Sequence, residues 1–81
     1  MKEKEVSSVD LFLLSNTNYT GLLTKSTGVI YHIKEGKIHN EDGPAITNGS
    51  YKLELYYING KRMEKTQWER IAKIKKLLDT E

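Results

Sequence analysis

Two histidines and the acids that follow the second one are the residues of this chain whose types and spacing could do chemistry. A two-residue turn at Glu35-Gly36 would form a hairpin that places His32 directly opposite His39 on one strand face. With Glu41 or Asp42, the pair could supply three ligands of a metal site that keeps an open position. The lysines beside the turn repel cations, however, and paired outward histidines are typical of a solvated surface. We therefore expect no metal and no cofactor.

Acid–base catalysis is the second chemistry to consider, with Asp10, Glu41 and Asp42 as candidate carboxylates. No nucleophile, oxyanion-stabilising device or phosphate-binding glycine loop accompanies them. The sequence His39-Asn40-Glu41 matches one half of the zinc-deaminase signature, but the other half needs cysteines and the chain has none. The lack of cysteine also excludes disulfides, thiolate zinc sites and cysteine catalysis. The sequence therefore predicts a protein that is not an enzyme.

Turn geometry explains the polar cluster that begins at His39 better than catalysis does. Asn and Asp side chains can bond their own backbone, Gly permits unusual backbone angles, and Pro fixes its φ. His39 is expected to hydrogen-bond this turn. A second tight turn is predicted at Asn59-Gly60, a strong short hairpin signal. The predicted structural turn motif consists of His39, Asn40, Asp42, Gly43, Pro44, Asn59 and Gly60.

Short strands must position these turns. Several segments alternate apolar and polar residues with a period of two, which is the pattern of half-buried strands. The expected strands cover residues 19–24, 28–34, 37–39, 45–47, 51–58 and 61–63. Between Val9 and Asn16 the apolar residues are consecutive, which is compatible with a strand or with one or two helical turns. We favour a strand there.

The spacing of the apolar residues changes after residue 64 and predicts a helix over about residues 67–79. Thr66-Gln67-Trp68-Glu69 has the form of a capping box, which places the helix start near Gln67. Lysines gather late in this segment and Glu69 sits early, as the helix dipole favours. One broad stripe is expected to pack on the sheet; its members are Trp68, Ile71, Ala72, Ile74, Leu77 and Leu78.

Length and composition allow one small domain. The chain has 81 residues, of which 37% are hydrophobic and 30% charged, with a formal net charge of +2. Its longest apolar run is far shorter than the roughly 18 residues of a membrane span, so we expect a cytoplasmic protein outside the membrane. Residues 1–5 are expected to be a disordered terminus. Residues 6–81 are expected to form one α+β domain, an antiparallel meander of about five to six short strands with the C-terminal helix packed on it.

Two surfaces of this fold could bind another molecule. Tyr56 opposes Met63 across the Asn59-Gly60 turn and, with Ile58, forms an apolar strand face that the helix or a partner must cover. The basic residues of the helix form the second surface. The candidate partner-binding residues are Tyr56, Ile58, Met63, Arg70, Lys73 and Lys76. Interleaved tyrosines and cations could also hold single-stranded nucleic acid, although a net charge of +2 is small for that function.

Two stretches echo each other along the chain, His32 to Lys37 and Tyr56 to Lys61. The segment Gly36-Lys37-Ile38-His39-Asn40-Glu41-Asp42-Gly43-Pro44-Ala45-Ile46, taken with the second stretch, resembles the G-K-x-H-N/R-E-D/N-G-P-A β-hairpin repeat of small proteins in tailed phages and other large DNA viruses, which is similar to variants of the MORN repeat. The resemblance covers Tyr31 to about Lys65 and implies stacked antiparallel hairpins and a phage origin. A single full copy and a terminal helix favour a compact domain over a long solenoid.

From these features we expect a small, non-enzymatic, phage-type accessory protein that binds a host protein in the host cytoplasm. Binding would inhibit a host enzyme or a defence system. A homodimer would enlarge the binding surface. The alternative function is a nucleic-acid-binding regulator that uses the basic C-terminal helix and exposed tyrosines.

Overall fold

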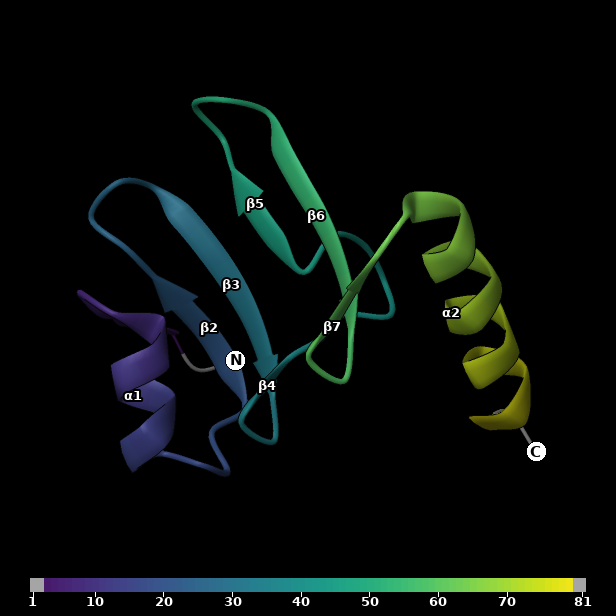
Figure 1. Ribbon diagram of the computed structural model, residues 1–81, viewed down its shortest axis with the longest axis horizontal. Coiled ribbons are helices and arrows are strands. Elements are labelled where there is room, and N and C mark those ends of the chain that lie inside the picture. Colours follow the sequence, from purple (N-terminus) through teal and green to yellow (C-terminus); the bar gives the residue numbers. More distant parts are fainter. Residues whose placement is uncertain (1–2, 80–81) are drawn as a thin grey trace.

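Seven short strands form one sheet with a helix near either end in the computed structural model, which describes residues 3–79 (Figure 1). The elements in chain order are β1 (Glu3–Glu5), α1 (Val9–Ser15), β2 (Gly21–Thr24), β3 (Val29–Lys34), β4 (Lys37–Ile38), β5 (Ile46–Asn48), β6 (Leu53–Ile58), β7 (Lys61–Met63) and α2 (Lys65–Asp79). The predicted α+β class, with a mostly antiparallel sheet and α2 packed on it, is confirmed.

The strand order is β1-β2-β3-β5-β6-β7, and β4 also pairs with β3. β4 pairs with the C-terminal end of β3, and β5 pairs with its N-terminal half. Between these two strands, residues 39–45 form a loop that runs beside β6, while its two ends stay bonded to His32 of β3. The Asn40 N–H donates to the Tyr57 carbonyl at 3.2 Å, and the Ala45 N–H donates to the Leu55 carbonyl at 2.8 Å. We call residues 39–45 the crossing segment, because it joins the two halves of the sheet.

Both predicted two-residue hairpin turns are confirmed, together with their registers. Lys34 pairs with Lys37 across the first turn, and Tyr56 pairs with Met63 across the second. Each turn has positive φ at both central positions, 50° and 79° at Glu35-Gly36 and 51° and 84° at Asn59-Gly60. These angles are typical of type I′ turns, whose twist matches that of the flanking strands.

The two helices pack on opposite faces of the sheet. Side chains of directly paired residues point to the same face, and successive residues alternate. Through the registers of β2, β3, β5 and β6, Leu23 shares a face with Leu55, so Tyr56 points to the other face. Leu23 lies in the core under α1, with Val9 and Ile33, whereas Tyr56 lies in the core under α2. The core under α2 is Tyr56, Ile58, Trp68 and Ala72, with Met63 and Ile71 packed against it.

The segment from Val9 onward is a helix, so the preference for a strand there is corrected. Ser8 caps it, since its Oγ accepts a hydrogen bond from the Leu11 N–H at 3.3 Å. Val9 is buried and Phe12 packs beside it in the core under α1, while Leu11 and Leu14 are exposed. Burial therefore follows the helical spacing of i and i+3, which a consecutive apolar run conceals.

The disordered terminus expected over residues 1–5 is corrected for Glu3–Glu5, which form β1; residues 1–2 lie outside the described residues. β1 pairs in parallel with β2, and the Val6 N–H continues the pairing to the Thr24 carbonyl at 2.8 Å. All three side chains of β1 are exposed. Backbone pairing alone makes this strand, so the sequence pattern carried no signal of it.

α2 begins at Lys65, before the predicted start near Gln67. The Trp68 N–H donates to the Glu64 carbonyl at 2.9 Å, which is the first hydrogen bond of the helix. Thr66 therefore lies inside the first turn and does not form the predicted capping box. β6 is also shorter than predicted, because Lys52 has a φ of 52° and still belongs to the preceding turn.

Candidate functional site

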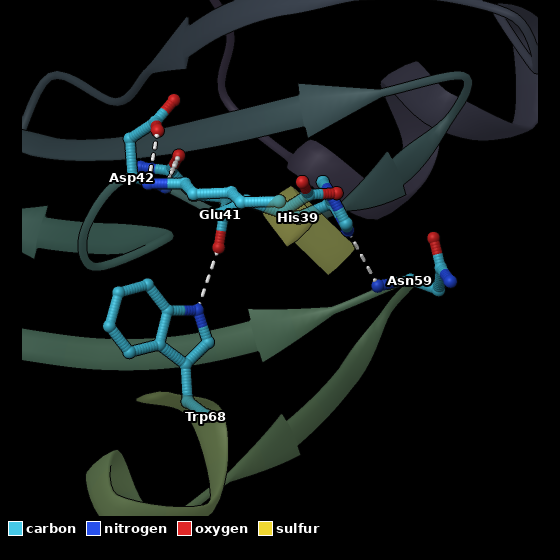
Figure 2. A network of polar contacts seen from close by, with 7 residues as sticks. His39, Glu41, Asp42, Asn59 and Trp68 are labelled. Carbon is cyan, nitrogen blue, oxygen red and sulfur yellow. Dashed lines mark hydrogen bonds and ion pairs between the residues drawn. The ribbon is translucent and has the colours of Figure 1, made fainter. Parts of the chain in front are cut away.

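The crossing segment is held by a buried histidine. His39 is 6% exposed, and its ring bonds on both sides: Nδ1 accepts from the Asn59 N–H at 2.9 Å, and Nε2 lies 2.8 Å from Glu41 Oε2 (Figure 2). Because Nδ1 accepts a backbone N–H, it carries no proton, so the proton of the neutral ring is on Nε2 and is donated to the Glu41 carboxylate. His39 thus connects both predicted turns, one through each ring nitrogen.

Asn40 ties the crossing segment to α2. Its side chain closes the turn, with Oδ1 accepting from the Asp42 N–H and Nδ2 donating to the Pro44 carbonyl, both at 3.0 Å. Its backbone carbonyl accepts a hydrogen bond from the Trp68 indole Nε1–H at 2.7 Å, which is the dashed line that rises from the Trp68 ring in Figure 2. Trp68 is 8% exposed and belongs to the core under α2, so this bond joins the crossing segment to that core.

The two histidines are neighbours along the backbone, where the His39 N–H donates to the His32 carbonyl at 3.0 Å. Their environments differ, because His39 is buried in its own hydrogen bonds and His32 is half-buried on β3. Partial burial lowers the pKa of His32, which favours its neutral form. Among residues 3–79, no group of three or more His, Asp or Glu side chains is arranged to hold a metal ion.

The contrast between the histidines gives a direct test of the structural role of His39. His39→Ala should lower the free energy of unfolding by about 3 kcal/mol, because it leaves a cavity and removes the acceptor of the Asn59 N–H. His32→Ala should cost about 1 kcal/mol or less, because that side chain is partly exposed. Urea denaturation of both variants makes the comparison. Equal losses would contradict the assignment of His39 as the residue that joins the two turns.

A groove of about 400 Å³ separates the crossing segment from α2. Its lining is Glu41, Asp42, Trp68, Glu69, Ala72, Lys73, Lys76 and Leu77. Lys76 Nζ reaches across to Asp42 Oδ1 at 2.9 Å, and this hydrogen bond, together with the positive charge of Lys76, lowers the pKa of Asp42. Both side chains are largely exposed, so the pair fixes the rim of the groove more than it stabilises the fold.

The apolar strand face proposed as a partner surface is covered. Tyr56 is 9% and Ile58 7% exposed, and both pack against Trp68. The ring centroids of Tyr56 and Trp68 are 4.8 Å apart. Met63 is half-buried beside them. α2 therefore covers this strand face, which leaves no room for a partner on it. The partner-binding role expected for Tyr56, Ile58 and Met63 is corrected. Arg70 and Lys73 are exposed as expected, and Lys76 bonds Asp42.

α2 carries a second apolar side that the sheet leaves uncovered. Ile74, Leu77 and Leu78 are 56%, 63% and 68% exposed. Trp68 and Leu77 are nine residues apart, which at about 100° per residue places them on opposite sides of the helix. One sheet face cannot cover both, so the single broad stripe predicted from the sequence is divided into a buried and an exposed part. We call Ile74, Leu77 and Leu78 the uncovered side of α2.

The remaining candidates from the sequence do not line the groove. Tyr51 is 80% exposed in the β5–β6 turn, whereas Tyr19, Tyr31 and Tyr57 are half-buried. Of the tyrosines that the nucleic-acid alternative uses together with the basic helix, only Tyr51 is exposed, and it does not lie on α2. Asp10 lies exposed in the first turn of α1, where the helix dipole favours a negative charge.

Comparisons with models of known protein families, with curated proteins and with solved structures found no match. No helix among the described residues is long and apolar enough to cross a membrane.

Proposed function

We propose that this protein is a non-enzymatic binding domain whose α2 presents the surface for a protein partner. The observation that carries the proposal is the uncovered side of α2, where three large apolar residues of one helix are more than half exposed. Exposed apolar residues that gather on one element favour an interface, because single scattered ones are ordinary on protein surfaces. The resemblance to phage accessory proteins supports a host protein as the partner, and binding would inhibit a host enzyme or a defence system.

The mixed charge beside α2 favours a protein over nucleic acid as the partner. Arg70 and Lys73 are exposed on the helix, but Glu41 and Glu69 line the adjacent groove and Lys76 is already bonded to Asp42. A polyanion that followed the helix would meet these carboxylates. Proteins, by contrast, bind through patches of mixed charge around an apolar centre.

A site-specific crosslink tests this function. A photoreactive phenylalanine analogue replaces Ile74 in one variant and Leu11 in the other, since these residues are similarly exposed, 56% and 67%, on different helices. Illumination in nuclease-treated host lysate should give one major adduct from position 74 that position 11 does not give. Adducts that are the same from both positions would contradict a binding surface on α2. Crosslinking of position 74 to nucleic acid in untreated lysate would favour the alternative function, a nucleic-acid-binding regulator.

A further inference from the structure

The positive charge of the protein is concentrated in α2. Residues 65–79 contain five Lys or Arg and two Asp or Glu, a net charge of +3, while the whole chain has +2, so the other residues together carry −1. Among the described residues, Arg70, Lys73 and Lys75 make no salt bridge, in contrast to Lys76. Cations without an internal partner therefore border the uncovered side of α2.

The shape of the uncovered side is that of a helix ridge. Ile74, Leu77 and Leu78 follow the spacing i, i+3 and i+4, which places their side chains next to one another along α2. Such ridges pack well into the grooves between side chains of a second helix. An amphipathic helix that presents its apolar face is therefore the element that best fits this side.

Charge selects among the helices that could bind. A second copy of α2 would bring a net +3 against a net +3, so self-association through this side is opposed by repulsion. Acidic side chains on a partner helix would instead meet Arg70, which lies one turn before Ile74, and Lys73 and Lys75, which lie at the two edges of the ridge. The apolar contact would supply affinity, and the charges would supply orientation and selectivity.

We propose that the uncovered side of α2, bordered by Arg70, Lys73 and Lys75, docks an acidic amphipathic helix of the partner protein. This inference rests on the proposed function and adds the chemistry of the partner segment. The ridge runs from Ile74 to Leu78, which is little more than one turn of helix, so the docking contact alone is small, and an isolated peptide should bind in the micromolar range or weaker.

Synthetic peptides of matched design test the charge selectivity. Three 18-residue peptides share one helical scaffold: the first has a leucine stripe flanked by glutamates, the second has lysines in place of the glutamates, and the third has serines in place of the leucines. Fluorescence anisotropy of the labelled peptides, titrated with the whole protein at low salt, gives the affinities. The glutamate peptide should bind about tenfold or more tightly than the lysine peptide, and the serine peptide should not bind.

A charge reversal locates the effect. In the double variant Arg70→Glu with Lys73→Glu, the preference should change to the lysine peptide. Lys34→Glu with Lys37→Glu is the matched control, because it changes the net charge equally on the exposed β3–β4 hairpin and should leave the preference unchanged. Melting curves verify that both variants fold.

The outcomes separate this inference from the function on which it rests. Equal affinity for the two charged peptides, or the same response in both double variants, would overturn the acidic helix. If the crosslink from position 74 still captured one protein, the binding function would stand and only its chemistry would change. A third outcome would overturn the inference in favour of a polyanion. In it, the glutamate peptide fails to bind, whereas a phosphatidylserine vesicle or an oligonucleotide binds the unmodified protein and does not bind the Arg70→Glu with Lys73→Glu variant.

Discussion

Gly36→Ala should lower the free energy of unfolding by about 3 kcal/mol or more, with a fall in Tm of more than about 10 °C. Gly36 has a φ of 79°, and a Cβ built there would overlap the Thr17 carbonyl oxygen and lie 2.8 Å from its carbon. The turn cannot move away freely, because the Gly36 N–H donates to the Tyr19 carbonyl at 2.8 Å and the Glu35 N–H to Thr20 Oγ1 at 2.9 Å.

Gly49→Ala is the control for this substitution. A Cβ at Gly49 meets nothing within 4 Å, and its φ is not in the left-handed region. Its stability should change by less than about 0.5 kcal/mol. Thermal melts of the two variants, followed by circular dichroism, give the comparison. Similar melting temperatures would mean that the Glu35-Gly36 turn does not approach Thr17 as closely as described.

Trp68→Ala should lower the free energy of unfolding by about 3–5 kcal/mol, because it removes the largest side chain of the core under α2. Trp68→Phe separates the two contributions of the side chain. It keeps an aromatic ring against Tyr56 but removes the donor to the Asn40 carbonyl, so about 1–3 kcal/mol should be lost.

Ile74→Ala serves as the control on the same helix, since Ile74 is 56% exposed and should change stability by about 0.5 kcal/mol or less. Urea denaturation, followed by far-ultraviolet circular dichroism, measures all three variants. Equal losses in the free energy of unfolding for Trp68→Ala and Ile74→Ala would mean that α2 is not docked on β6. They would contradict the division of the helix into a buried and an exposed side.

The sequence predicts the hairpins well because their signals are local. Glu35-Gly36 and Asn59-Gly60 need positive φ within two residues, and that requirement sets the register of every flanking pair. The sequence also predicts that His39 hydrogen-bonds the turn that follows it, and its bond to Glu41 is of that kind. Its second bond, to the Asn59 N–H, was not predictable, because it joins residues twenty apart that meet only when the crossing segment lies beside β6.

Tertiary context decided the features that the sequence did not predict. β1 has no buried side chain and forms because β2 offers a free backbone edge. α1 is a helix because Val9 and Phe12 meet the same core, although the run from Leu11 to Leu14 is uniformly apolar. The exposed side of α2 depends on how much of the helix the sheet can cover. The helical spacing alone indicates an exposed side, because Trp68 and Leu77 are nine residues apart and lie on opposite sides of the helix, where one sheet face cannot cover both.

The proposed function requires that α2 is anchored by Trp68 and binds a protein partner with its uncovered side. Its most direct test is the affinity of the partner captured through position 74 for two double variants, measured by isothermal titration calorimetry. Ile74→Ser with Leu78→Ser should weaken binding by at least tenfold, because both residues belong to the uncovered side. Leu11→Ser with Leu14→Ser removes similarly exposed residues of α1 and should leave Kd unchanged. Equal affinities of the two variants, or a larger loss from the α1 variant, would contradict the proposed function.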